Sequence, residues 1–307
     1  MDWRRLLPRA VLLALGILMA IAPNVLAALP CEVDALARTW CTVDPPNSIA
    51  SVAFGINPEG NIVGFYVDPT GVYHGYLFRN GVFTTIDMEG MGMLFAGKID
   101  PKGEVVGWAY DSSWREHGFV WRKGEVTPFT ISGAAQTGLR GLNPQGDLVG
   151  YYIIQPTSGA PEYHGFLWRN GTLSEIAFPG ALRTIPWSIN ASGEISGTFV
   201  DPASPGITRG FLLNKRGEFV AIPEPFPGAA QWTPFDVNVH GQVVGEWREV
   251  AGSRYAHGYL FTEDGGVQRL DKPGALGTGL AGINPQGHIV GGFYDQNDVM
   301  HGFLLIP

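Results

Sequence analysis

The last 26 residues, 282–307, read GINPQGHIVGGFYDQNDVMHGFLLIP. They predict three short strands: one ending at Ile283, one over 288–295 and one over 301–306. Between the first two lies Asn284-Pro285-Gln286-Gly287, a turn in which proline presets one dihedral angle and glycine accepts a left-handed one. A sheet that ended on the third strand would expose an unpaired hydrophobic edge, which favours aggregation. We therefore expect a fourth strand from elsewhere in the chain.

The same pattern occurs five more times upstream. The glycines that close the turns are spaced 43, 43, 47, 48 and 46 residues apart, and they are Gly60, Gly103, Gly146, Gly193, Gly241 and Gly287. Each turn is followed by an apolar run and then by a dipeptide that opens another one: His74-Gly75, His117-Gly118, His164-Gly165, Arg209-Gly210, His257-Gly258 and His301-Gly302. Four short strands in a repeat of about 40 to 50 residues are typical of a β-propeller blade.

The missing strand is expected at the other end of the chain. Residues 41–45, Cys-Thr-Val-Asp-Pro, resemble the fourth strands of other repeats, such as Thr84-Thr85-Ile86-Asp87. If they pair beside the third strand of the last repeat, the ring closes and the exposed edge disappears. The sequence thus predicts an all-β fold, a six-bladed β-propeller with four antiparallel strands per blade. It forms a single domain over 41–307, preceded by a leader over 28–40.

The repeated phrase Ile-Asn-Pro-x-Gly-x-Ile-Val-Gly, followed by His-Gly-Phe and later by Phe-Pro-Gly-Ala, resembles the HAF repeat of bacterial extracellular proteins. The resemblance covers nearly all of the mature chain, although the His-Ala-Phe that names the family is His-Gly-Phe or His-Gly-Tyr in most copies here and Arg-Gly-Phe in the fourth. It implies secretion and a repeat fold. It implies no catalytic residue.

The N-terminus has the features of a signal peptide. Arg4, Arg5 and Arg9 precede an apolar run over 10–22, and Val25-Leu26-Ala27 offers a small-residue cleavage site. We expect cleavage after residue 27 and a secreted or periplasmic protein with no membrane span in its mature chain. Export would place Cys31 and Cys41, the only cysteines, in an oxidising compartment, so we expect a disulfide between them.

Charge and motifs narrow the function. Loss of residues 1–27 removes three arginines and one aspartate, so the net charge falls from −8 to about −10, which argues against a nucleic-acid partner. The acids six residues before His74, His117 and His301, Glu249 before His257, and Asp201 before Arg209 favour local pairing over a metal site. The sequence shows no catalytic motif and implies no cofactor.

Positions that differ between repeats are the candidate ligand contacts. Just before each turn, the innermost strand carries Lys98 and Asp236 where other repeats mostly have small residues. In a ring of six, repeats two and five are opposite, so we expect these two side chains to face each other across the axis. The predicted ligand-binding set adds residues one position earlier in other repeats and residues of the loops that lead into the innermost strands. It consists of Lys98, Arg140, Arg183, Trp187, Trp232 and Asp236. For the two tryptophans, packing between blades is the competing interpretation.

Three classes of function remain open. The first is a monomeric binding scaffold for an extracellular glycan, peptide or protein. The second is an extracytoplasmic carbohydrate-active hydrolase or lyase with acidic residues at the mouth of the central channel that the ring of blades would enclose. The third is a structural surface protein whose repeats assemble with other copies. Fold alone does not choose among them.

Overall fold

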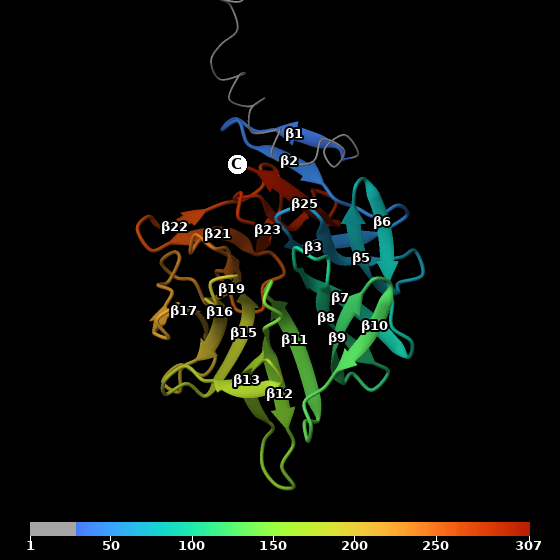
Figure 1. The fold of residues 1–307 in the computed structure, drawn as a ribbon. Coiled ribbons are helices and arrows are strands. Elements are labelled where there is room, and N and C mark those ends of the chain that lie inside the picture. The colour runs from blue at the N-terminus through green and yellow to red at the C-terminus, as the bar shows by residue number, and fades with distance from the viewer. Residues whose placement is uncertain (1–28) are drawn as a thin grey trace, which may run out of the picture.

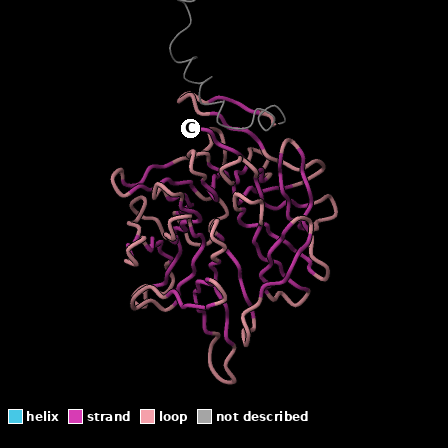
Figure 2. Tube along the Cα trace, viewed as in Figure 1, coloured by secondary structure: helices cyan, strands magenta, loops and turns pink. Residues whose placement is uncertain are grey.

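The computed structural model describes residues 29–307, which form strands, turns and loops without a helix (Figure 2). The predicted all-β fold is confirmed. Nothing in this part of the chain forms a helix that could cross a membrane. The predicted signal peptide lies outside the described residues.

Each of the six sequence repeats begins with an inner strand, and these strands lie towards the middle of the ribbon (Figure 1). They are β3 (Ala50–Ile56), β7 (Met91–Ile99), β11 (Gln136–Leu142), β15 (Arg183–Ile189), β19 (Gln231–Val237) and β23 (Gly277–Ile283). The second strands are β4 (Ile62–Val67), β8 (Val105–Asp111), β12 (Leu148–Ile154), β16 (Ile195–Val200), β20 (Val243–Arg248) and β24 (Ile289–Tyr294).

The outer strands follow in the same order. The third strands are β5 (Tyr73–Arg79), β9 (Glu116–Arg122), β13 (Glu162–Arg169), β17 (Thr208–Leu213), β21 (His257–Thr262) and β25 (Met300–Ile306). The fourth strands are β6 (Val82–Ile86), β10 (Glu125–Phe129), β14 (Thr172–Ile176), β18 (Phe219–Ala221) and β22 (Gly266–Arg269). Consecutive strands of a repeat pair antiparallel.

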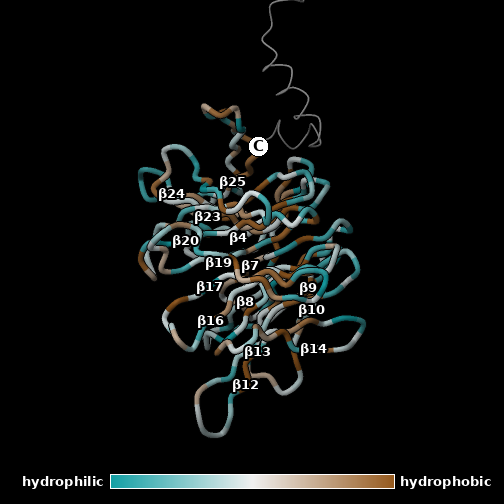
Figure 3. The backbone as a smooth tube through the Cα atoms, turned by 90° about the vertical axis from the view of Figure 1, so that its left-hand side faces the viewer, coloured by the Kyte–Doolittle hydropathy of each residue, from teal (hydrophilic) through white to brown (hydrophobic). Residues whose placement is uncertain are grey.

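The first two repeats are joined into one eight-stranded sheet, which differs from the predicted separate blades. The link is a single parallel bridge between Tyr73 of β5 and Met93 of β7. It arises because β7 has nine residues and begins early, so that its first part reaches β5. Apolar segments lie along the strands, while hydrophilic residues are common at the outer turns (Figure 3).

The last repeat takes its outer strand from the N-terminus. Strand β2 (Thr39–Thr42) pairs antiparallel with β25, and β1 (Cys31–Val33) adds a fifth strand outside it (Figure 1). Pairing begins two residues earlier than predicted because Trp40 belongs to the core: it is 1% exposed and packs on Phe303 with ring centroids 5.1 Å apart. Part of the predicted leader is therefore sheet. The predicted disulfide between Cys31 and Cys41 is confirmed.

Candidate functional site

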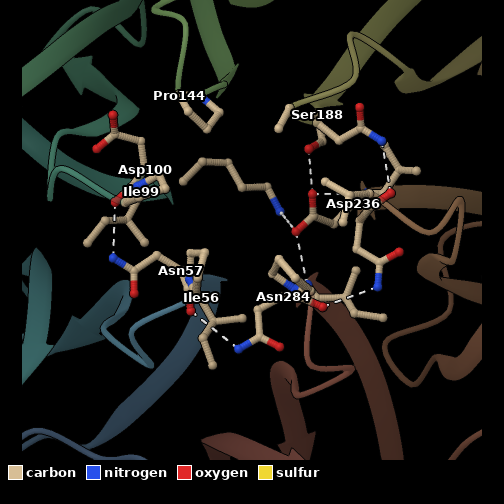
Figure 4. Close-up of a pocket in the computed structure, with 18 of the residues that line it drawn as sticks. Ile56, Asn57, Ile99, Asp100, Pro144, Ser188, Asp236 and Asn284 are labelled. Carbon is tan, nitrogen blue, oxygen red and sulfur yellow. Dashed lines mark hydrogen bonds and ion pairs between the residues drawn. The ribbon is translucent and has the colours of Figure 1, made fainter. Parts of the chain in front are cut away.

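The Asn-Pro-x-Gly turns meet at one end of the axis, which we call the turn mouth (Figure 4). The Asn oxygen accepts a hydrogen bond from the backbone N–H four residues on, as Asn57 does from Asn61. The turn glycine has a positive φ in every repeat, between 72° and 87°. The Asn amide then donates to the main-chain carbonyl of the equivalent residue in the next repeat. One asparagine thus closes its own turn and joins two repeats.

These inter-repeat bonds connect the last repeat to the first. The side-chain amide of Asn57 donates to the carbonyl oxygen of Asp100 at 3.0 Å. Four other asparagines make the equivalent bond, and the donor–acceptor pairs are Asn143–Asn190, Asn190–Asn238, Asn238–Asn284 and Asn284–Asn57. Asp100 is the exception, since an ionised carboxylate has no proton to donate. Between repeats two and three, Lys102 Nζ instead donates to Pro144 O at 2.9 Å.

A polar layer of Lys98, Ser188 and Asp236 lies directly inside the turns. Lys98 Nζ and Asp236 Oδ2 are 3.0 Å apart, so the expected pair across the axis is present. Lys98 also donates to the carbonyls of Phe54 and Ala281. Asp236 accepts from the Ser188 hydroxyl and from the backbone N–H of Ile283. Residues from five repeats therefore converge on one buried ion pair.

Burial sets the protonation balance of this layer. Desolvation lowers the pKa of Lys98 below its ordinary value, and the attraction of Asp236 offsets only part of that effect. All three protons of the ammonium group are donated to protein oxygens. In this structure the pair therefore joins repeats, and it leaves no ammonium proton for a ligand.

The opposite end of the axis is shaped by a β-bulge in every inner strand. The pairing register of the inner strand with the second strand skips one residue at the equivalent place in each repeat: Phe54, Gly97, Arg140, Trp187, Phe235 and Ala281. Bulges re-aim side chains and are common beside functional sites. All six bulge residues line one cavity of about 180 Å³, with Lys98 and Trp108. We call it the aromatic cavity.

Arg140 is the buried charge of the aromatic cavity. It is 5% exposed, its guanidinium carbon lies 4.1 Å from the ring centroid of Trp108, and its Nη1 is 2.6 Å from Glu116 Oε1. Tyr151 and Tyr110 donate their hydroxyls to the other oxygen of Glu116. Burial alone would raise the pKa of Glu116, but Arg140 and these hydrogen bonds outweigh it and hold the pKa below its ordinary value. The ion pair is thus neutral overall.

Of the six predicted ligand contacts, Lys98, Arg140 and Trp187 line the aromatic cavity, and Asp236 lies behind Lys98. The other two lie elsewhere. Trp232 is 6% exposed, packs in the core with Trp247 and donates its indole N–H to Ile222 O. Arg183 stacks over Tyr163 beside a different cavity. Phe54 and Phe235 stand at the same repeat position as Arg140 and Trp187 but were left out of the predicted set, and Trp108 was missed.

The repeated histidines are held by acids, as predicted, but often by a different acid. His117 pairs with Asp111 at 3.0 Å and Arg209 pairs with Asp201 at 3.0 Å. The expected partner of His257 was wrong: Nδ1 lies 3.0 Å from Asp271, at the end of the fourth strand, instead of near Glu249. The same place supplies Glu175 for His164 and a second acid for two other histidines, Asp87 for His74 and Asp44 for His301. The predicted partners Asp68 and Asp295 also contact His74 and His301, at 3.5 and 3.7 Å from Nε2. Within residues 29–307, no cluster of three or more acids, histidines or cysteines could hold a metal ion.

Comparisons with known proteins show the fold alone. No protein-family model and no curated protein sequence matches this chain. Among solved structures, TolB of Acinetobacter baumannii aligns with a TM-score of 0.55 at 13% identity over 81% of this chain, which spans 64% of that protein. The β-propeller domain of the Trilobed protease from Pyrococcus furiosus aligns with a TM-score of 0.51 at 9% identity over 90% of each chain.

A third structure is a variant of the lectin of Aleuria aurantia in complex with Fucα1-6GlcNAc. It aligns with a TM-score of 0.50 at 11% identity, over 86% of this chain and 93% of the lectin. At such low identities a shared ligand or activity does not follow from the likeness. The chain has a β-propeller fold.

Proposed function

We propose that this protein is an exported six-bladed β-propeller that serves as a binding scaffold, with its ligand site in the aromatic cavity. Two features support six blades closed into a ring. The turn-mouth bonds run on from Asn284 in the last repeat to Asn57 in the first. Strand β2 completes the last repeat and brings Asp44 to His301 at 2.7 Å.

Export is supported by the signal-peptide pattern of residues 1–27, by the resemblance to HAF repeats and by the disulfide between Cys31 and Cys41. Disulfides persist in oxidising compartments and are rare in the cytosol. The proposed location is therefore secreted or periplasmic.

The observation that carries the binding proposal is the set of six bulges. In each repeat a bulge of the inner strand places one residue at the axis, and the six residues range in size from glycine to tryptophan. Trp187 and Phe235 meet edge to face, with centroids 5.1 Å apart, and leave the cavity open beside them. Aromatic walls with a few fixed polar groups are typical of ligand pockets.

A binding screen with a cavity-filling variant tests this function. The mature protein is offered glycan and peptide arrays, and each hit is measured again with Ala281→Leu. Position 281 is equivalent to Phe54, Trp187 and Phe235, so the strand accepts a larger side chain there. We expect this variant to lose the hits and a control at the turn mouth, Val239→Ser, to retain them. Hits that bind both variants equally would place the ligand site outside the cavity.

One observation favours the hydrolase or lyase as a second candidate. Burial raises the pKa of Glu246, which lines a cavity next to the aromatic one, above its ordinary value, and Arg248 opposes this only in part. A raised carboxyl pKa is a property of general acids. The buried carboxylates of Glu116 and Asp236 are held by other groups: Glu116 by Arg140 and two tyrosines, and Asp236 by Lys98 and Ser188. Mass spectrometry of each glycan hit after incubation would reveal turnover, which the scaffold proposal does not predict.

A further inference from the structure

A second cavity, of about 240 Å³, adjoins the aromatic one, and we call it the side cavity. It lies between repeats five, six and one. Phe54, Phe235 and Ala281 line both cavities. A ligand group held in the aromatic cavity therefore has the side cavity as its neighbour, and the polar groups there bear on what that ligand is.

Glu246 and Arg248 are the charged pair of the side cavity. Glu246 Oε1 and Arg248 Nη1 are 2.7 Å apart. Among the described residues, none donates a hydrogen bond to the second oxygen, Oε2, and the buried Nε of Arg248 has no partner. The pair is neutral overall. Nε is enclosed by protein, so the groups that remain for a ligand are Glu246 Oε2 as acceptor and Arg248 Nη2 as donor, which has no hydrogen-bond partner among the described residues.

Gly279 keeps Glu246 Oε2 uncovered. A Cβ atom at this glycine would lie 2.8 Å from that oxygen. Its φ lies outside the left-handed region, so the backbone itself does not demand glycine. The absence of a side chain at position 279 thus has a steric consequence at the carboxylate.

The aromatic cavity offers almost no free hydrogen-bonding group. The Lys98 protons are all donated, the Trp187 indole N–H donates to Thr198, and Arg140 is paired with Glu116. Arg140 Nε is the one buried side-chain polar atom of its described lining residues without a partner. A sugar ring inside would leave several hydroxyls unpaired, each at a cost in free energy. An aromatic or aliphatic group meets no such penalty.

We propose, on the basis of the proposed function, that the ligand is a polypeptide segment whose aromatic side chain enters the aromatic cavity while its backbone amide binds the Glu246–Arg248 pair. The amide N–H donates to Glu246 Oε2, and the amide carbonyl accepts from Arg248 Nη2, because the Nε of that guanidinium is enclosed by protein. A peptide amide carries one donor and one acceptor, as the pair requires. A free amino acid fits less well, because two full charges would be desolvated against a pair that is already neutralised.

The probes are capped pentapeptides with Phe, Tyr or Trp between glycines, a matched peptide with central Ala, and free phenylalanine. Binding to the disulfide-bonded mature protein is followed by NMR titration. We expect the aromatic peptides to bind at least about tenfold more tightly than the Ala peptide and free phenylalanine. Equal binding of free phenylalanine, or no preference for an aromatic residue, would overturn the proposal.

Two variants test the amide contact separately. In Glu246→Gln the side-chain oxygen stays with Arg248 and an NH₂ group faces the peptide N–H, so affinity should fall about tenfold or more. Gly279→Ala keeps the charge but covers Oε2, and it should produce a similar loss. Glu104→Gln, which alters a Glu–Arg pair with Arg122 at 2.9 Å far from the cavities, is the control. Melting curves establish that each variant is folded.

The outcomes separate this inference from the proposed function. If Ala281→Leu abolishes array hits but Glu246→Gln and Gly279→Ala leave peptide affinity unchanged, the cavity binds ligands and the peptide assignment is wrong. If only glycans lose binding in Ala281→Leu, the peptide assignment is likewise wrong. If no hit depends on position 281, both fail together.

Discussion

The two ends of the axis use the same six repeats in opposite ways. At the turn mouth every repeat begins its turn with asparagine or aspartate and ends it with glycine, and each asparagine makes the same bond to the next repeat. At the bulge layer the backbone is equally regular, yet the side chains range from glycine to tryptophan. Repetition supports the architecture where the same bond recurs, as it does in five of the six repeats. Variation appears where side chains enclose a cavity.

The polar layer between the two ends shares features of both. Lys98 and Asp236 occupy a position at which the other four repeats have glycine or serine, so this layer varies between repeats as the bulge layer does. They nevertheless join repeats, as the asparagines do, through bonds to Phe54, Ala281 and Ile283. A side chain that departs from a repeat is therefore no guarantee of a ligand contact.

The largest effect is expected from removing the strand that completes the last repeat. Deletion of 28–46 takes away β2 and Trp40 and exposes the edge of β25, so both ends of the axis should lose their order together. We expect aggregation or a Tm lower by more than about 10 °C in a thermal melt. Deletion of 28–37 with Cys41→Ser removes only β1 and is the control, with a small shift. A full deletion that melts like the intact protein would refute closure by β2.

Breaking the polar layer should come next. Lys98→Ala leaves Asp236 buried without its cation, and the cost in unfolding free energy should be about 3–5 kcal/mol. Asp236→Ala should be similarly harmful, and the double variant should cost clearly less than the sum of the two. Denaturant unfolding measures all three. The half-exposed pair Arg122 and Glu104 is the comparison, with an expected coupling of about 0–1 kcal/mol. Additive losses at Lys98 and Asp236 would show that they act independently.

The smallest effect is expected at the turn mouth, from replacing Asp100, the turn residue that lacks the amide donor of the other five. Asp100→Asn supplies the missing amide donor towards Asn143, so the protein should gain about 0.5–1.5 kcal/mol in stability. Burial raises the pKa of the Asp100 carboxyl in the folded state, with hydrogen bonds from Glu104 opposing. The folded state then binds the proton more tightly than the unfolded state, so this group's contribution is present at low pH and lost as pH rises through the raised pKa.

Melting curves of the two proteins from about pH 3 to pH 7 measure that difference. The advantage of Asp100→Asn should be smallest at acidic pH, where Asp100 is protonated, and should grow as the carboxyl ionises. A variant without added stability at pH 7 would mean that the bond from Lys102 to Pro144 already joins the turns of repeats two and three as well as an amide would.

Much of the fold could be predicted because it depends on local signals that recur. Turn chemistry and repeat spacing indicated where strands begin and end, and the lone edge in residues 282–307 pointed to the N-terminus. The pair of Lys98 and Asp236 followed from counting repeats. The start of β2 was misplaced although the repeat carried the signal: Trp40 pairs with Leu305 just as Phe83 pairs with Phe78 in the first repeat. Its burial against Phe303 is a tertiary effect.

The aromatic cavity was only partly predictable because a bulge changes which way one residue points. Its signal was in the sequence: the glycine of each Ile-Val-Gly motif, such as Gly64, pairs with the residue just before the bulge. A Cβ at Gly64 would lie 1.9 Å from the Val52 carbonyl oxygen, so glycine permits the close approach. Trp232 follows the competing interpretation stated for it, since it packs in the core instead of contacting the cavity.

The pairing of β2 with β25 also orders events in time. Thr39 is hydrogen-bonded in the sheet beside Ile306, so a strand made near the beginning of synthesis has to wait for nearly the whole chain before it finds its partner. Such distant pairing is slow because the entropy of a long loop must be lost before the contact forms. Until β25 has been made, β2 lacks its partner strand and remains an unpaired edge. The time before β2 pairs with β25 is therefore the time in which its open edge is most exposed to strands of other chains and to proteases.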